Sequence, residues 1–134
     1  MKKILVLCTG NSCRSQILEG WLRHFSKERY EVYSAGIEAH GVNPDAIFFM
    51  KEVGVDISHH SSDLIDKYLS IEFDLVISVC DHAKESCPVF PNTIMSLHRN
   101  FEDPSKITAH QSAAYSRVIE ELREYALLVV DEIG

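Results

Sequence analysis

The chain has 134 residues, of which 46% are hydrophobic and 25% charged, a composition typical of a soluble globular protein. A chain of this length can bury one core, so we expect a single domain over residues 1–134. The net charge of −7 and the scattered Lys and Arg argue against nucleic acid as a partner. No apolar run is long enough for a signal peptide or a membrane span. We therefore expect a cytoplasmic protein that does not contact a membrane, with a monomer as the default.

Strand and helix patterns alternate from the start of the chain. Residues 2–8 contain an apolar run that predicts a central strand, and residues 30–34 predict a second strand by their alternating pattern. Residues 14–27 between them have helical spacing, which predicts a parallel, right-handed strand-helix-strand unit. The predicted buried face of this helix comprises Ile17, Leu18, Trp21, Leu22 and Phe25.

The same alternation continues to the end of the chain. Asn43 and Pro44 predict the start of a helix that stops at Gly54, and residues 73–79 and 93–97 predict a third and a fourth strand. The predicted buried face of this helix is Ala46, Phe49, Met50 and Val53. A short helix with Leu64, Ile65 and Tyr68 is expected before the third strand, and a last helix from Tyr115 to Ile133 after the fourth.

These elements predict a small doubly wound α/β fold with three layers, in which about four parallel strands have helices on both faces. Such sheets bind ligands beyond the carboxyl ends of their strands. Cys8 and Cys80 end the first and third predicted strands, so both thiols are expected at that edge.

Residues 8–15 join the first predicted strand to the first predicted helix. A turn of this kind gathers unpaired backbone N–H groups at a helix N-terminus, where the helix dipole favours an anion. Gly10 and Asn11 both tolerate the positive φ that such a loop usually needs. A Walker phosphate loop is excluded because no Gly-Lys-Ser/Thr follows.

Cys8 and Arg14, at opposite ends of this loop, would aim a nucleophile and an oxyanion clamp at one bound anion. A helix N-terminus and a nearby cation lower the pKa of a cysteine, so we expect Cys8 to be a thiolate at neutral pH. Ser12 or Ser15 could donate a hydrogen bond to this sulfur and assist when it leaves. The competing interpretation is that Cys8 is an inert core residue at a strand end.

Residues 8–15, followed by Glu19-Gly20 and Ser34-Ala35-Gly36, resemble the phosphate loop of the low-molecular-weight protein tyrosine phosphatase superfamily. Within that superfamily, residues 11–16 are most similar to the arsenate reductase branch. The resemblance implies the superfamily's α/β fold and an oxyanion held by the whole loop. Its binding residues would be Cys8, Thr9, Gly10, Asn11, Ser12, Cys13 and Arg14. For Cys13 itself we expect packing against the sheet rather than a redox role.

Cys80 and Cys87 form a second informative pair, with six residues between them in a polar segment. Cysteines in a chain without an export signal suggest catalysis, redox exchange or metal binding rather than structural disulfides. Cys80, His82 and Cys87 are competent zinc ligands, but their spacing matches no common ligand pair and a fourth ligand is not evident. Inert buried cysteines are a further alternative. The pair resembles the redox cysteines of thioredoxin-coupled arsenate reductases, which simple phosphatases of the superfamily lack.

Residues 98–104 resemble the superfamily's general-acid loop, with Asp103 before Pro104 as the acid that protonates the leaving oxygen. Arg99 and Asn100 replace the Trp and Gly of the usual His-Trp-Gly-Phe pattern, so the packing of this loop is left open. Ser105 stands where the superfamily's phosphatases commonly have Tyr, which weakens a phosphatase assignment. Asp-Pro also begins many ordinary turns, which is the structural alternative.

The resemblance further implies a potassium ion beside the phosphate loop, held by Asn11, Glu19, Ser34 and Asp63. All four side chains offer oxygen, which suits a hard cation. Glu19 and Asp63 could instead be solvated or capping residues. For the adjacent His59-His60 we expect solvated side chains rather than a metal site.

The resemblance as a whole implies reduction of arsenate. Cys8 would attack arsenic while Asp103 protonates the departing oxygen. Cys80 and then Cys87 would take over the oxidation as disulfides, and thioredoxin would reduce the final Cys80–Cys87 pair.

Two other function classes remain open at this stage. A low-molecular-weight protein tyrosine phosphatase would use Cys8, Arg14 and Asp103 without needing the later cysteines. A non-enzymatic sensor would bind a metal or arsenite through Cys80, His82 and Cys87. The electron donor is also open, between thioredoxin, glutaredoxin and mycothiol-type systems.

Overall fold

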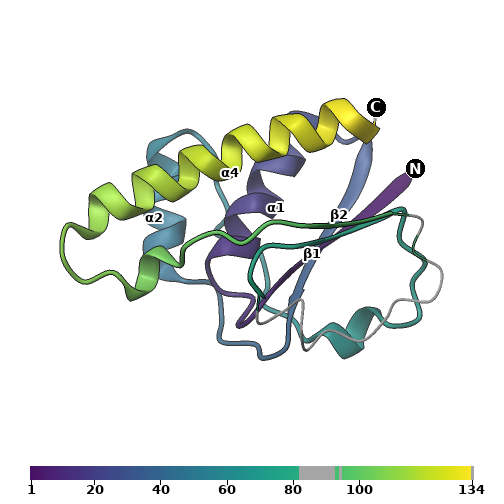
Figure 1. The fold of residues 1–134 in the computed structure, drawn as a ribbon, viewed down its shortest axis with the longest axis horizontal. Coiled ribbons are helices and arrows are strands. Elements are labelled where there is room, and N and C mark those ends of the chain that lie inside the picture. The colour runs from purple at the N-terminus through teal and green to yellow at the C-terminus, as the bar shows by residue number, and fades with distance from the viewer. Residues whose placement is uncertain (82–92, 94, 134) are drawn as a thin grey trace.

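A four-stranded parallel sheet forms the centre of the protein in a computed structural model that describes residues 1–81, 93 and 95–133 (Figure 1). The strands are β1 Lys2–Cys8, β2 Tyr30–Gly36, β3 Leu75–Ser78 and β4 Met95–His98, in the order β2-β1-β3-β4. The prediction that the first strand is central is confirmed. Because all strands are parallel, their carboxyl ends lie at one edge of the sheet.

Three α-helices and two short 3₁₀ helices complete the described fold. These are α1 Arg14–Ser26, α2 Pro44–Glu52, η1 Ile65–Tyr68, η2 Pro104–Lys106 and α4 Gln111–Ile133. Figure 1 shows α1, α2 and α4 gathered together beside the sheet. On β2, Ser34 bonds to Glu19 of α1, whereas the neighbouring Tyr33 packs its ring on Tyr68 of η1. Adjacent strand residues point to opposite faces, so α1 and η1 cover the two sides of the sheet, as predicted.

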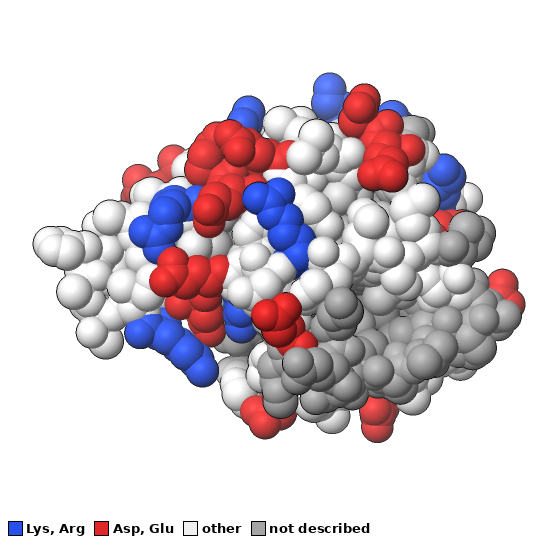
Figure 2. Space-filling model, viewed as in Figure 1, with Lys and Arg blue, Asp and Glu red and all other residues white. Residues whose placement is uncertain are grey.

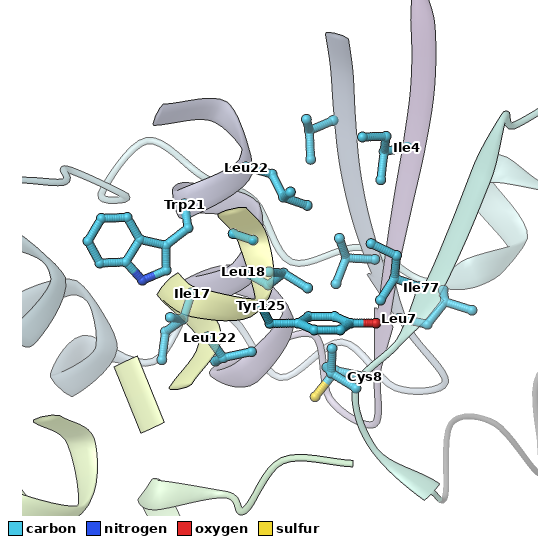
Figure 3. Close-up of a cluster of buried hydrophobic side chains, with 14 of the residues drawn as sticks. Ile4, Leu7, Cys8, Ile17, Leu18, Trp21, Leu22, Ile77, Leu122 and Tyr125 are labelled. Carbon is cyan, nitrogen blue, oxygen red and sulfur yellow. The ribbon is translucent and has the colours of Figure 1, made fainter. Parts of the chain in front are cut away.

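The main core lies between the sheet and the pair formed by α1 and α4. Figure 3 shows Leu18 and Leu22 of α1 meeting Leu122 and Tyr125 of α4 over the strands, with Cys8 at the edge of this cluster. The indole of Trp21 donates a hydrogen bond of 3.1 Å to the carbonyl of Ile119, which ties the two helices together. The core therefore fixes the end of β1, where the predicted oxyanion loop begins.

Element boundaries differ from the predictions at several ends. β2 continues two residues past Ser34, because Ala35 and Gly36 pair with the last residues of β1. β3 is shorter than residues 73–79, and β4 lies one to two residues later than residues 93–97. The last helix begins at Gln111, one turn before Tyr115, and the first ends at Ser26 with Lys27 in the left-handed region.

The predicted buried face of α2 is wrong at one position. Ala46 and Met50 are fully buried, and Phe49 is partly buried with its ring 4.9 Å from that of Tyr115. Val53 is 49% exposed, because α2 ends at Glu52 and the chain turns away at Gly54, whose φ is +87°. Helical spacing assigned Val53 to the buried face, but this spacing holds only as far as the helix continues.

Acidic and basic side chains are intermingled on the face seen in Figure 2, and no broad basic patch is visible there. Among the described residues, no helix is long and apolar enough to cross a membrane.

We predict that α4 stabilises the fold through its inner face only. Leu122 is fully buried, so Leu122→Ala should lower the free energy of unfolding by about 2–5 kcal/mol through lost burial and a residual cavity. Leu128 lies on the same helix but is 62% exposed, and Leu128→Ala should change the free energy of unfolding by less than about 0.5 kcal/mol. Urea unfolding followed by circular dichroism measures both variants. Equal losses for the two would contradict this packing.

Candidate functional site: the loop after the first strand

A pocket of about 170 Å³ opens at the carboxyl end of β1. Its walls come mostly from the loop between β1 and α1, together with one residue of segment 38–43 and three from residues 103–106. The lining residues are Cys8, Thr9, Gly10, Ser12, Cys13, Arg14, His40, Asp103, Ser105 and Lys106. A second hollow of about 380 Å³ shares Thr9, Arg14, Asp103 and Lys106 and extends to Cys80, Asp81 and Asn100. The two hollows thus bring the predicted loop, the predicted acid and Cys80 to one place.

Segment 38–43 holds the loop in its curved shape. Three of its backbone N–H groups donate to loop carbonyls, each at 2.9 Å: Glu38 to Thr9, His40 to Gly10 and Asn43 to Ser12. Because these carbonyls are engaged on the outside of the curve, the loop's N–H groups are left for the inside, where an anion would need them.

Two glycines allow this close packing. A Cβ on Gly36 would lie 2.4 Å from the carbonyl oxygen of Glu38 and 2.7 Å from the backbone nitrogen of Asn11, so only glycine fits. A Cβ on Gly10 would lie 2.6 Å from Nδ1 of His40. The prediction of a positive φ is confirmed for Asn11, at 47°, but is wrong for Gly10, which is needed for space rather than for backbone conformation.

Asn11 is the buried centre of the loop's hydrogen bonding. Its Oδ1 accepts from the backbone N–H of Asp63 at 2.7 Å, and its Nδ2 donates to the hydroxyls of Ser15 and Ser34 at 2.9 and 3.0 Å. Its own carbonyl accepts from the amide of Gln16 at 3.0 Å. One fully satisfied polar side chain therefore joins the loop to α1, to β2 and to the segment before η1.

The guanidinium of Arg14 reaches across the mouth of the loop toward the acid segment. Its Nη1 donates to the carbonyl of Phe101 at 2.9 Å, and its Nη2 lies 3.8 Å from Oδ2 of Asp103. Its Nε is buried and has no hydrogen-bond partner. A buried donor without an acceptor is costly, so this atom is suited to an anion bound in the pocket.

The thiols of Cys8 and Cys80 are both buried at the same edge of the sheet, where Cys80 interacts with the side chain of Cys8. This interaction, followed by burial, raises the pKa of Cys8 well above its ordinary value, and the opposing effects of Arg14 and of the Ser15 backbone N–H are smaller. The prediction of a Cys8 thiolate at neutral pH is therefore wrong for this arrangement. Sequence reasoning placed the cation near Cys8 and Cys80 at the same edge, but it did not weigh the effect of burial and of a second thiol on the acidity of Cys8.

Cys80 also lies 3.1 Å from the hydroxyl of Thr9, so the end of β3 is joined directly to the loop. Cys8, Cys13 and Cys80 are all thiols. Cys87 and His82 lie outside the described residues. Within the described part of the chain, no group of three or more His, Cys, Asp or Glu side chains is arranged to hold a metal ion.

Ser12, Cys13 and Ser15 belong to the same loop but have different surroundings. The hydroxyl of Ser15 accepts from Asn11, and it is the backbone N–H of Ser15 that bonds to Cys8, whereas Ser12 lines the pocket. Cys13 is buried, with its sulfur 3.9 Å from the hydroxyl of Tyr115. It therefore packs toward α4 rather than against the sheet as predicted. Burial is the main cause that raises the pKa of Cys13 to about 12.

Asp103 both begins a turn and lines the pocket, so the two interpretations of Asp-Pro are compatible. Its Oδ1 accepts from the backbone N–H and the hydroxyl of Ser105, at 3.0 and 2.6 Å, at the start of η2. Its Oδ2 is the oxygen nearer Arg14. Arg99 lies over the rings of Phe101 and Tyr125, at 5.1 and 5.5 Å from their centroids, which shows how this loop packs with Arg in place of Trp.

Of the four expected potassium ligands, three are linked side chain to side chain. Ser34 donates to Oε1 of Glu19 at 2.5 Å and accepts from Asn11. Oε2 of Glu19 pairs with Arg23 at 2.8 Å. Asp63 reaches Asn11 only through its backbone N–H.

The carboxylate of Asp63 accepts instead from the side chains of Ser61, Lys67 and Tyr68. The prediction of solvated histidines is wrong for His60, whose side chain is 2% exposed and bonds through Nδ1 to Gln16 at 3.0 Å. Burial lowers the pKa of His60, and Glu19 opposes this shift.

Sequence reasoning missed two residues that line the pocket, His40 and Lys106. His40 lies in the segment between β2 and α2 and Lys106 ends η2, and neither belongs to a motif used in the sequence analysis. Only the loop character of residues 36–43, next to a strand end, hinted at the first of them.

Comparisons with known proteins agree with this geometry. The sequence profile of the family described as low molecular weight phosphotyrosine protein phosphatase matches residues 3–128. An arsenate reductase of Halalkalibacterium halodurans is 48% identical over 124 residues, covering 90% of this chain and 89% of its own. Solved structures of an arsenate reductase in the phosphate-binding and oxidised states match with TM-scores of 0.89 and 0.86, at 31% and 30% identity, and each covers 100% of both chains. The chain therefore belongs to the low-molecular-weight phosphotyrosine protein phosphatase family, in the branch of its arsenate reductases.

Proposed function

We propose that this protein reduces arsenate to arsenite, with Cys8 as the nucleophile and Cys80 as the first internal reductant. The observation that carries the proposal is that a second buried thiol, Cys80, lies 3.1 Å from Thr9 of the loop that begins at Cys8, beside an oxyanion-sized pocket. Transfer of a phosphoryl group needs one thiol, whereas a two-electron reduction needs a second one within reach of the first. The names of the arsenate reductase relatives support the same substrate.

Arsenate would bind inside the loop, on its backbone N–H groups and on Arg14, whose Nε has a hydrogen bond to give. Cys8 then attacks arsenic, and the leaving hydroxyl takes a proton from Asp103 and departs as water. The proton that Cys8 gives up restores Asp103, so the step is neutral overall. The product is a covalent Cys8–arsenic adduct. Ser15 holds the sulfur through its backbone N–H when it later becomes a leaving group.

The second step transfers two electrons to arsenic. Cys80 attacks the Cys8 sulfur, the sulfur–arsenic bond breaks with its electron pair on arsenic, the Cys80 proton passes to an oxygen on arsenic, and arsenite leaves as arsenic(III). A Cys8–Cys80 disulfide remains. Cys87 then attacks Cys80 and releases Cys8, leaving a Cys80–Cys87 disulfide. A dithiol protein of the thioredoxin class reduces this last pair and completes the cycle.

A relay of three cysteines predicts that each is essential for turnover. Arsenate-dependent NADPH consumption, with thioredoxin and its reductase, should fall to background in Cys8→Ser, Cys80→Ser and Cys87→Ser. Normal cycling by Cys87→Ser would remove that residue from the relay. If arsenate is not reduced at all, but an aryl phosphate is hydrolysed at the same rate with and without Cys80, the protein is a phosphatase.

The neighbouring thiol also predicts the acidity of the nucleophile. Because the interaction with Cys80 is the first cause that raises the pKa of Cys8, Cys80→Ala should lower this pKa and increase the thiolate fraction at neutral pH. The rate of iodoacetamide labelling of Cys8 against pH, read by peptide mass spectrometry, measures the midpoint. Cys13→Ala is the matched control and should leave the midpoint in place. An unchanged midpoint in Cys80→Ala would show that burial alone sets the acidity.

A potassium ion is proposed in the hollow of about 120 Å³ beside the loop, lined by Glu19, Ser34 and Asp63 among others. Their oxygens suit a hard cation. Asn11 fits less well as a ligand, because its Oδ1 is bonded to the backbone of Asp63 and its Nδ2 faces Ser34. Glu19, Ser34 and Asp63 would therefore hold the ion, and Asn11 would support them. No step of the reaction depends on it.

This ion predicts a cation-specific gain in stability. Potassium chloride at about ten times the dissociation constant should add roughly 1.4 kcal/mol to the free energy of unfolding, raising Tm by a few degrees over choline chloride of equal ionic strength. Glu19→Gln should abolish the difference, whereas Glu28→Gln should retain it. The same Tm in both salts for the wild type would rule the ion out.

A further inference from the structure

Cys80 is followed by a residue that the proposed reaction does not use. Asp81 is exposed, with 69% of its side chain accessible, yet it is held at two points by residues at and just after the end of β4. Its backbone N–H donates to Oδ1 of Asn100 at 3.1 Å. Its Oδ1 lies 2.7 Å from Nε2 of His98. Asp81 is thus fixed in place by one bond from its backbone and one to its carboxylate, although its side chain is exposed.

His98 contacts residues that precede and follow Cys80 in the sequence. Its Nδ1 lies 2.7 Å from the hydroxyl of Ser78, two residues before Cys80, while its Nε2 meets Asp81, one residue after. A carboxylate only accepts, so Nε2 carries the hydrogen; in the neutral ring Nδ1 then accepts from Ser78. In the protonated ring both nitrogens donate, and the bond to Asp81 is kept. The imidazole therefore links Ser78 and Asp81, which flank Cys80 in the chain, in either protonation state.

The backbone of the same segment adds to this link. The N–H of Arg99 donates to the carbonyl of Ser78 at 3.0 Å, and the N–H of Phe101 donates to the carbonyl of Val79 at 2.9 Å. The carbonyl of Phe101 accepts from Arg14, so the segment that holds Cys80 also holds the oxyanion clamp. Asn100 stands where the family pattern has Gly, so its bond to Asp81 is a feature that a glycine could not supply.

We propose that His98 and Asn100 are positioning residues for Cys80, which by holding Asp81 keep the Cys80 sulfur against Cys8 for the step that releases arsenite. This inference rests on the proposed function, since it assigns a role within the second step. A positioning role of this kind affects the second step of the proposed reaction and not the binding of the oxyanion. Binding of the oxyanion depends on the loop and on Arg14, whereas attack on the Cys8 sulfur depends on where Cys80 lies.

The test separates these steps in the full-length reduced protein without thioredoxin. Asp81→Ala removes the acceptor for His98 and should slow the single-turnover release of arsenite by roughly 10–100-fold, since small displacements of reacting atoms have effects of this size. Asp81→Asn keeps an oxygen acceptor in the same place and should stay within about threefold of wild type. Phosphate protection of Cys8 from iodoacetamide, which reports oxyanion binding, should be the same in all three proteins.

A second measurement is independent of arsenate. In a Cys87→Ser background, the equilibrium between the Cys8–Cys80 disulfide and glutathione reports the effective concentration of one thiol at the other. Asp81→Ala and His98→Ala should each lower this effective concentration about tenfold or more, and Asp81→Asn should not.

The outcomes divide cleanly. Release of arsenite by Asp81→Ala at the wild-type rate, or an unchanged glutathione equilibrium, overturns the positioning role. Loss of phosphate protection in Asp81→Ala also overturns it, because the effect would then lie in the loop. If the wild type releases no arsenite, the proposed function fails, while the glutathione equilibrium still decides whether Asp81 positions Cys80.

Discussion

The curvature of the loop after β1 is the constraint on which the rest of the site depends. This curvature is set from outside, by the N–H groups of segment 38–43 on the loop carbonyls, and from beneath, by the buried side chain of Asn11. Gly36 permits both, because any side chain there would collide with the backbone of Glu38 and of Asn11. A rigid loop of this kind presents its N–H groups without reorganisation when an anion arrives, which is where such sites gain their strength.

Arg14 extends this preorganisation to the acid segment. With one terminal nitrogen bound to the carbonyl of Phe101, the guanidinium cannot swing away, and its unpartnered Nε remains available. Asp103 is held in a similar way, since Ser105 occupies Oδ1 and leaves Oδ2 as the oxygen nearer the guanidinium. Arg14 and Asp103 are thus each held in place through one side-chain atom, which leaves another atom of the same group available in the pocket. The acidic net charge of the chain makes this local capture necessary for an anionic substrate.

The sequence predicted the sheet, its central strand, and Cys8 and Cys80 at one edge, because these follow from apolar periodicity and from the rule for parallel sheets. The place of Asp103 in the site was expected only from the family resemblance. The sequence did not predict what depends on contacts between distant segments. His60, expected in solvent, is buried because α1 offers it Gln16. The acidity of Cys8 was predicted from two local effects, and both are present. They are outweighed by a thiol 72 positions away in the chain, which no local pattern could reveal.

The placement of Cys80 beside Cys8 opposes the first step of the proposed reaction and prepares the second. Burial and the neighbouring Cys80 raise the pKa of Cys8, which favours the protonated thiol, and a protonated thiol is a poor nucleophile and a poor target for oxidants. In the proposed first step Cys8 gives up its proton, which restores Asp103, only as it attacks an oxyanion bound on Arg14. Once the adduct forms, the Cys8 sulfur becomes the electrophile, and the thiol that suppressed its reactivity is already beside it. Because a thiolate is oxidised more readily than a thiol, a Cys8 that stays protonated until an oxyanion binds is less exposed to oxidants between turnovers.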